Sequence, residues 1–253
     1  MSLPHAFYDR PLAHRALHDV RDGRPENSRA AVRAAIAAGY GIEIDVQLSA
    51  DGAAMVFHDY SLDRLTGAKG TIRSCRADEL AQIHLTGGEE GVPTLPEVLD
   101  LVAGRVPLVI EIKDQDGDMG PAIGPLEEAT AAAVRGYEGD VAVMSFNPHA
   151  VARMAELVPD VPRGLVTSAY RYDEWPLSKT TCDRLRGIPD YDRVGASFIS
   201  HEVDDLTRAR VSELKALGAM ICCWTVRTVE EEKIARQIAD NITFEGYRAA
   251  LTA

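Results

Sequence analysis

Short apolar runs alternate with alanine-rich stretches of helical periodicity along most of the chain. Eight of these runs predict strands, at 11–15, 41–47, 107–113, 141–146, 163–167, 194–199, 219–226 and 241–245. Most of them are apolar at nearly every position, which is typical of parallel strands covered on both faces. The pattern therefore predicts a mainly parallel sheet with helices packed against it.

Helical patterns fill the intervals between the strands and have recognisable ends. Residues 28–38 follow Asn27, a residue type that favours the cap of a helix, and they stop at Gly39. Residues 206–217 stop in the same way at Gly218. Eight strands alternating with helices in a chain of 253 residues predict a (β/α)8 TIM-type barrel, with an open doubly wound sheet as the alternative.

One region interrupts the alternation. Residues 47–58 predict a hairpin around Asp51-Gly52, a strong turn signal. Residues 59–96 are rich in glycine and polar residues and have little periodicity, so we expect a lid or wall over a site. We therefore predict a single barrel domain over residues 1–253, with an inserted hairpin and loop segment at about 47–96.

The composition is that of an acidic globular protein. The chain has 27 Lys and Arg against 39 Asp and Glu, and a formal net charge of −12. This balance argues against a nucleic-acid partner or an anionic membrane surface, because neither would attract the chain at long range. A small anionic substrate stays compatible with it, provided that a metal or local basic groups reverse the field within the site.

Cysteine usage and hydropathy bear on the compartment. The four cysteines at 75, 182, 222 and 223 have no Cys-x-x-Cys spacing, which favours reduced, mostly buried thiols over a disulfide framework or a zinc site. The first residues lack the apolar core of a signal peptide, and no run approaches the length of a membrane span. We expect a soluble, cytoplasmic protein without stable membrane association.

Acidic residues occur at alternate positions within two of the predicted strands. Glu43 and Asp45 lie two residues apart, so they face the same side of a strand, and Glu111 repeats the pattern with Lys113 two residues later. Carboxylates buried in an apolar strand are costly unless an opposite charge compensates them. Glu43, Asp45 and Glu111 therefore predict a seat for a hard divalent cation. The alternative is a salt network with Lys113 and Arg15.

Two histidines and two basic residues lie where they could reach that seat. His14 ends the first strand, and His58 returns at the end of the hairpin that starts beyond Asp45. We expect His14 and His58 to flank a reacting centre, one removing a proton and the other donating one. Arg15 and Lys113 supply fixed positive charge of the kind that holds a phosphate.

At this point the chain resembles the glycerophosphodiester phosphodiesterases. The motifs that carry the resemblance occur in the family's order: Ala13-His14-Arg15, Pro25-Glu26-Asn27-Ser28, Glu43-Ile44-Asp45-Val46-Gln47-Leu48, Asp51-Gly52, Val56-Phe57-His58-Asp59, Leu62-Asp63-Arg64-Leu65-Thr66, Val92-Pro93-Thr94-Leu95, Glu111-Ile112-Lys113, Ser145-Phe146 and Trp224-Thr225-Val226. They extend from residue 13 to about 226 and are densest before 115.

The resemblance implies a metal-dependent barrel enzyme that splits glycerophosphodiesters into glycerol 3-phosphate and an alcohol. It implies that Mg²⁺ or Ca²⁺ is bound by the three acids, that the two histidines are the acid–base pair, and that Arg15 and Lys113 hold the phosphate. Phe146 and Trp224 would line the pocket. From the sequence alone we favour barrel packing for both aromatics, and only the resemblance assigns Trp224 to the site.

Three positions depart from the family pattern. The family usually has Gly after His-Arg, where this chain has Ala16, and we expect Ala16 to crowd the phosphate slightly. The family's Trp-Thr-Val-Asn ends here in Arg227, and its terminal Ile-Thr-Asp-x-Pro pattern is present only as ITFEG at 242–246. These last two changes lie at the last strands and affect the leaving-group side of the pocket.

Two further functions fit the same residues. Relatives of the family include phospholipase D-like toxins and phosphoinositide-cleaving phospholipases, which cleave lipid headgroups at membranes. The acidic balance and the lack of an amphipathic apolar stretch disfavour that reading. The other function is a catalytically inactive barrel that binds a phosphodiester, which ranks lower because all the ionisable groups that the chemistry needs are present.

Overall fold

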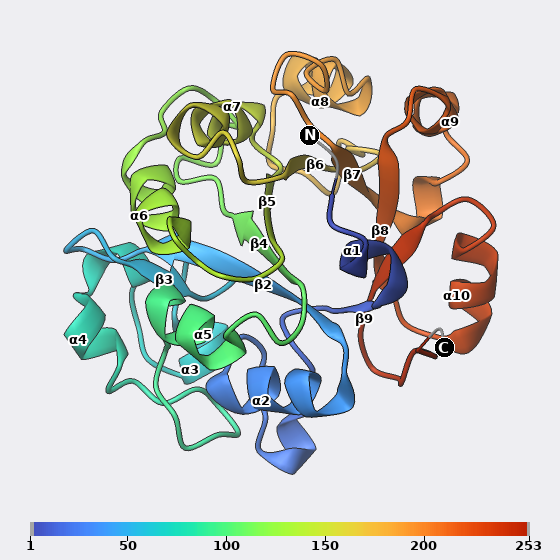
Figure 1. Ribbon diagram of the computed structural model, residues 1–253. Coiled ribbons are helices and arrows are strands. Elements are labelled where there is room, and N and C mark those ends of the chain that lie inside the picture. The colour runs from blue at the N-terminus through green and yellow to red at the C-terminus, as the bar shows by residue number, and fades with distance from the viewer. Residues whose placement is uncertain (1–2, 252–253) are drawn as a thin grey trace.

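A closed barrel of eight parallel strands forms the body of the protein. The computed structural model describes residues 3–251, so the outermost residues of the predicted 1–253 domain lie outside it. The strands are β1 (Leu12–Ala13), β2 (Gly41–Leu48), β4 (Leu108–Ile112), β5 (Val141–Ser145), β6 (Arg163–Thr167), β7 (Phe198–Glu202), β8 (Met220–Val226) and β9 (Asn241–Phe244). Because β1 pairs in parallel with both β2 and β9, the sheet closes on itself (Figure 1). The predicted TIM-type barrel is confirmed.

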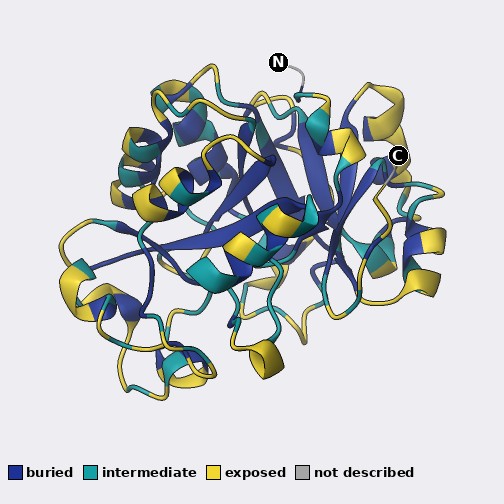
Figure 2. Cartoon of the chain, turned by 60° about the horizontal axis from the view of Figure 1, so that its bottom comes forward, coloured by how far each residue is buried: buried dark blue, intermediate teal, exposed yellow. Residues whose placement is uncertain are grey.

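Helices surround the barrel. They are α2 (Arg29–Ala38), α5 (Leu95–Val102), α6 (Pro125–Val134), α7 (Pro148–Leu157), α8 (Lys179–Arg186), α9 (Ala209–Ala216) and α10 (Val229–Ala235). Apart from α8, whose Cys182 and Leu185 pack in a separate cluster with Tyr170, their inward faces share one large hydrophobic cluster with the outward faces of the strands. The outer faces of the helices are exposed (Figure 2). No helix in the range 3–251 is long and apolar enough to cross a membrane.

The barrel interior is packed at one end and hollow at the other. Phe7 of α1 (Ala6–Asp9) joins inward-facing side chains such as Val109, Met144 and Phe198 in a second cluster. The side-chain amide of Asn241, at the start of β9, donates to the carbonyls of Phe7 and Arg10 at 2.8 Å. The N-terminal ends of the strands are thereby closed, and the carboxyl ends are left for a site, as barrel enzymes place theirs.

The region between β2 and β4 forms a small packing unit of its own. Strand β3 (Ala54–Val56) pairs antiparallel with β2 through the turn at Asp51-Gly52. Short helices α3 (Asp63–Thr66) and α4 (Ala77–Leu80) and the 3-10 turn η2 (Ile72–Ser74) follow. Their apolar side chains form a separate cluster that includes Met55, Phe57, Leu62, Ile72, Leu80, Leu85 and Val92. We call this cluster the satellite core.

Two predicted elements differ from those observed. The strand expected at 194–199 is β7 at Phe198–Glu202, because Gly195 adopts a left-handed φ of 60° and the true strand is hidden by the polar but buried Ser200 and His201. His201 is satisfied within the barrel, where its Nδ1 lies 2.7 Å from Thr167 Oγ1. The helix expected at 206–217 begins only at Ala209, after the 3-10 turn η3 (Val203–Asp205).

The prediction that Asn27 caps α2 was wrong. The cap is Ser28, whose Oγ accepts the Ala31 N–H at 3.1 Å. Asn27 has a left-handed φ of 57°, and its side chain turns away from the helix into the barrel.

Barrel packing can be tested at Gly164 on β6. A Cβ at this position would lie 2.5 Å from the Phe198 ring, so we expect Gly164→Ala to lower the free energy of unfolding by about 1–3 kcal/mol. Gly187→Ala is the matched control, because Gly187 has a φ of −78° and its Cβ would meet nothing closer than 3.4 Å. Urea denaturation of both variants gives the comparison; equal effects would contradict the packing described.

Candidate active site

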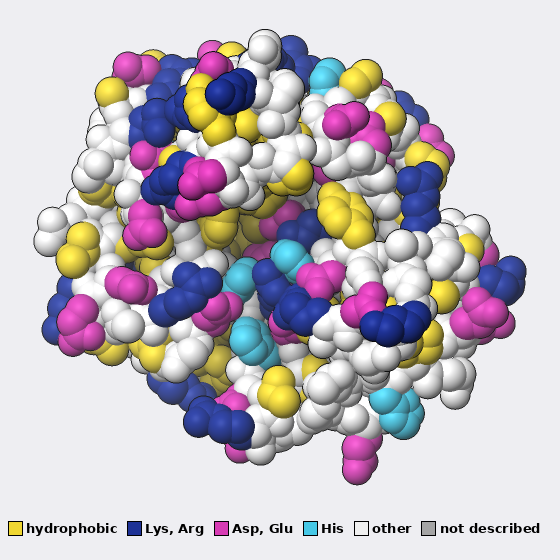
Figure 3. All heavy atoms as spheres, turned by 180° about the vertical axis from the view of Figure 1, so that it is seen from behind, with side chains coloured by type: hydrophobic (Ala, Val, Ile, Leu, Met, Phe, Trp, Pro, Cys, Tyr) yellow, Lys and Arg dark blue, Asp and Glu magenta, His cyan; other side chains and the backbone are white. Residues whose placement is uncertain are grey.

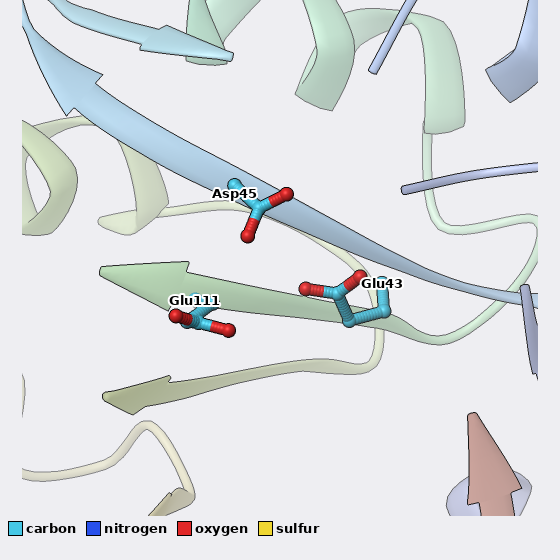
Figure 4. Close-up of side chains that lie close together, drawn as sticks. All are labelled: Glu43, Asp45 and Glu111. Carbon is cyan, nitrogen blue, oxygen red and sulfur yellow. The ribbon is translucent and has the colours of Figure 1, made fainter. Parts of the chain in front are cut away.

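Three carboxylates converge inside the carboxyl end of the barrel. Asp45 on β2 and Glu111 on β4 are register partners, and Glu43 lies two residues earlier on the same face of β2. One carboxylate oxygen from each lies within 4.8 Å of the others (Figure 4). All three side chains are buried. The convergence expected from the i, i+2 spacing is therefore present.

Glu43 is the least compensated of the three. Its Oε2 accepts the backbone N–H of Arg15 at 2.9 Å, while its Oε1 is buried without a hydrogen-bond partner. Burial raises the pKa of Glu43 well above its ordinary value, and the neighbouring charges of Asp45 and Glu111 raise it further. This oxygen is an open acceptor in a region of excess negative potential.

Asp45 is held from several sides. Asn27 donates its side-chain amide to Oδ2 at 2.9 Å, and the Lys113 ammonium lies 2.7 Å from Oδ1. Although burial alone would raise it, the positive charges of Lys113, His58 and Arg15 keep the pKa of Asp45 well below its usual range. Asp45 is therefore ionised, and Asn27 fixes the direction of its carboxylate.

Lys113 spans two of the acids, since its Nζ also contacts Glu111 at 2.6 Å. Part of the salt network considered as the alternative to a metal is thus real. It does not account for the whole cluster, because Glu43 Oε1 has no partner. Three oxygen donors with one unsatisfied oxygen fit a hard divalent cation, which prefers oxygen ligands.

Both predicted histidines lie near this cluster, since they line the same cavity as Glu43 and Glu111. His14 follows β1, and its Nδ1 lies 2.6 Å from Oε2 of Glu245. His58 follows the hairpin, and its Nδ1 lies 2.7 Å from Oδ1 of Asp59. Burial lowers the pKa of His14, an effect that the hydrogen bond to Glu245 opposes. In both rings Nδ1 is therefore the nitrogen that faces a carboxylate.

Arg15 reaches the cluster through an unusual backbone. Arg15 and Ala16 both have left-handed φ angles, 51° and 65°, which turn the Arg15 N–H toward Glu43. The Arg15 guanidinium donates to Glu26 at 2.6 Å, and its Nε lies 3.7 Å from Asp45 Oδ2, buried without a hydrogen bond. An unsatisfied donor therefore lies next to the carboxylate of Asp45.

A cavity of about 140 Å³ opens over these groups. It is lined by His14, Arg15, Glu43, His58, Glu111, Lys113, Met144, Phe146, Val166, Ser200, Trp224, Thr225, Arg227 and Thr243. One wall is charged and the other mainly apolar, where the Phe146 and Trp224 rings meet edge to face at 5.5 Å. Figure 3 shows the hollow, with histidine, basic, acidic and apolar side chains gathered around it.

Eight of the nine predicted site residues line this cavity, and Asp45 lies directly beneath it in contact with Lys113 and Asn27. Ala16 is buried and does not line it. Its left-handed φ favours glycine, the residue usual in the family, and costs another residue roughly 1–2 kcal/mol.

Sequence reasoning predicted no role in the site for several residues that support it. Asn27, Glu26, Asp59 and Arg64 all fall within the recognised motifs, and that membership was the only signal for them. Arg64 contacts both Glu26 and Asp59, which links Arg15 to His58 through one chain of ion pairs. Glu245 lies in the altered 242–246 segment and had no such signal.

Comparison with known proteins agrees with this geometry. The profile of the glycerophosphoryl diester phosphodiesterase family matches residues 14–241. The chain belongs to this family. A glycerophosphodiester phosphodiesterase from Caldanaerobacter subterraneus is 33% identical over 165 residues, which cover 61% of this chain and about two thirds, 66%, of the relative's length.

Other members of the glycerophosphoryl diester phosphodiesterase family match over more of the chain. Human glycerophosphodiester phosphodiesterase 1 is 25% identical, with 87% of this chain and 72% of the human protein covered. A phosphodiesterase from Oleispira antarctica, solved in complex with the product sn-glycerol-3-phosphate, superimposes with a TM-score of 0.73 at 25% identity. That match covers 96% of this chain and 93% of the solved one.

The clustering of three acids predicts that Glu43 lowers the stability of the folded protein as pH rises. Because the pKa of Glu43 is raised in the folded state, the metal-free protein binds this proton more tightly than the unfolded chain does. Its contribution to stability is present below about pH 4.5 and is lost as pH rises through the raised folded pKa. We therefore expect Glu43→Gln to become more stable relative to wild type between pH 5 and pH 8.

The measurement is urea denaturation of both proteins in EDTA at the two pH values. Adding a divalent cation at about 100 times its dissociation constant should stabilise wild type by roughly 2.7 kcal/mol and Glu43→Gln far less. An unchanged stability difference between pH 5 and pH 8 would contradict the electrostatic account of the cluster.

Proposed function

We propose that the protein hydrolyses glycerophosphodiesters to glycerol 3-phosphate and an alcohol in a metal-dependent reaction. The observation that carries this proposal is the buried cluster of Glu43, Asp45 and Glu111, flanked by His14 and His58 in a member of this family. The solved relative with bound sn-glycerol-3-phosphate supports the choice of product.

In this proposal Glu43, Asp45 and Glu111 hold one divalent cation, Mg²⁺ or Ca²⁺. When bound, such an ion polarises a phosphoryl oxygen and orients the diester. The open Oε1 of Glu43 supports this ligand set. Asn27 keeps the Asp45 carboxylate in place from behind, as partners of metal ligands commonly do.

Arg15 and Lys113 bind the phosphate and spread its developing negative charge. The Arg15 Nε–H has no hydrogen-bond partner within residues 3–251, so it can donate to a phosphate oxygen. Lys113 keeps its proton at all ordinary pH values: burial alone would lower its pKa, but Asp45 and Glu111 hold it above the usual lysine range. Phe146 and Trp224 form the apolar wall for the carbon part of the substrate.

His14 and His58 transfer the protons. Because a carboxylate is within hydrogen-bond distance of Nδ1 in each ring, Nε2 is the atom that exchanges a proton with substrate. One histidine takes the proton of the nucleophile, which is water or the glycerol hydroxyl beside the phosphate. The other protonates the departing alkoxide.

We further propose that residues 1–253 act as one domain in the cytoplasm, with the 47–96 segment forming one wall of the site. Support for the wall is that His58 and Arg64 come from this segment. Cys75, Cys182, Cys222 and Cys223 are all free thiols, which fits a reducing compartment.

The acid–base roles predict large losses of turnover. His14→Ala and His58→Ala should each lower kcat on glycerophosphocholine by roughly 10²–10⁴-fold. His5→Ala serves as the control, because His5 is exposed just before α1, at the opposite end of the barrel. The assay is released glycerol 3-phosphate in Mg²⁺ or Ca²⁺; near wild-type rates from both site variants would refute the roles.

The alternatives are separated by substrate and by metal. Turnover of phospholipid vesicles in preference to glycerophosphocholine would indicate a phospholipase instead. Tight binding of glycerophosphocholine without hydrolysis in saturating Mg²⁺ or Ca²⁺ would indicate an inactive barrel. Full activity after exhaustive chelation would exclude the metal mechanism.

A further inference from the structure

His14 stands at one end of a row of three polar side chains. Oε2 of Glu245 lies 2.6 Å from His14 Nδ1, and Oε1 of the same carboxylate accepts Nε of Arg227 at 2.9 Å. The hydrogen bond to His14 keeps the pKa of Glu245 far below its ordinary value, with His18 and Arg227 adding to the effect. The carboxylate is therefore an anion with its two oxygens engaged on opposite sides.

We propose that Glu245 and Arg227 are a positioning pair for His14, in which the carboxylate selects the imidazole tautomer and the arginine holds the carboxylate. The inference rests on the proposed function, since it concerns a histidine that moves a proton. Neither residue touches the reacting atoms in this scheme.

The sequence provides an independent reason for treating the two residues as a pair. Arg227 stands where the family usually has asparagine, and Glu245 lies in the altered segment at 242–246. These two departures are 18 residues apart, yet they meet in one ion pair. Their contact behind a proposed acid–base group supports treating the two residues as a pair.

A second histidine explains why the carboxylate needs the arginine. His18 Nε2 lies 3.7 Å from the same Oε2 of Glu245 and is buried without a hydrogen-bond partner. Oε2 of Glu245 therefore faces two imidazoles. Oε1 is the oxygen through which Arg227 can hold the carboxylate in place. Behind it lies a cavity of about 330 Å³, lined in part by His18, Glu245 and Tyr247, into which an unanchored carboxylate can turn.

The arrangement at His58 repeats the same chemistry. Asp59 contacts the ring at Nδ1, and Arg64 binds both oxygens of Asp59 at 2.7 and 2.8 Å. The two histidines thus have the same support, built from unrelated segments of the chain. In each, a carboxylate that accepts the Nδ1 proton leaves the lone pair of Nε2 facing the cavity.

Glu245→Gln tests the proposal, because an amide both donates and accepts and so no longer selects one tautomer. We expect kcat on glycerophosphocholine to fall by roughly 10–10²-fold with KM changed by less than about threefold. Glu245→Asp, which keeps the charge, should retain more activity than Glu245→Gln. Imidazole ¹H–¹⁵N correlation spectra, with His14 assigned from its Ala variant, should show one tautomer in wild type and a mixture in Glu245→Gln.

Arg227→Ala should lower kcat by about two- to fivefold in the wild-type background and have no further effect in Glu245→Gln. Glu231→Gln is the matched control for Glu245→Gln. Glu231 accepts the Arg227 backbone N–H at 2.6 Å, so this variant also removes one negative charge near Arg227, but at a residue that does not contact His14. It should leave both kcat and the spectrum unchanged.

An unchanged His14 tautomer in Glu245→Gln, or an Arg227→Ala loss of equal size in both backgrounds, would overturn the positioning role. The spectrum also separates this inference from the proposed function. If wild type shows no turnover of any glycerophosphodiester, hydrolysis fails as the function, while the tautomer measurement still decides whether Glu245 positions His14.

Discussion

Mutual repulsion among three buried carboxylates is the constraint on which the rest of the site depends. Glu43, Asp45 and Glu111 come together because strand pairing leaves them no alternative: Asp45 and Glu111 are register partners in the barrel wall. Hydrogen-bond donors and positive charges from other segments of the chain offset part of this repulsion. Lys113 spans two of the acids, and the left-handed turns at Arg15 and Asn27 bring a backbone N–H and an amide to the other side. The unusual backbone is thus a consequence of the charge cluster.

Much of this could be predicted from the sequence because it depends on local periodicity. Inward acids follow from the two-residue repeat of a strand, and the hairpin turn at Asp51-Gly52 brings His58 back toward the level of Asp45. The Phe57 N–H to Asp45 carbonyl bond, 3.0 Å long, fixes that return. Regular strand pairing makes the relative positions of such residues predictable within a strand or hairpin. Closure of the barrel then brings neighbouring strands together.

Other features could not be predicted because tertiary contacts decide them. Asn27 has the sequence context of a helix cap, but Asp45 binds its side chain and Ser28 takes the cap instead. Strand β7 is hidden because Ser200 and His201 are polar although both are buried, and His201 lies 2.7 Å from Thr167 on the neighbouring strand. Glu245 contacts His14 although 231 residues separate them in the sequence, and local periodicity cannot predict a contact at that separation.

The satellite core affects how the protein responds to heat and to mutation. His14 is carried by the barrel, whereas His58 is carried by the segment that packs around Phe57, Leu62 and Leu80. The apolar packing that holds one histidine in place therefore differs from the packing that holds the other. Sequence drift or mild heat that loosens this minor unit would displace one of the two proposed acid–base groups while the barrel stays folded. Inactivation and global unfolding would then be two events with different temperatures.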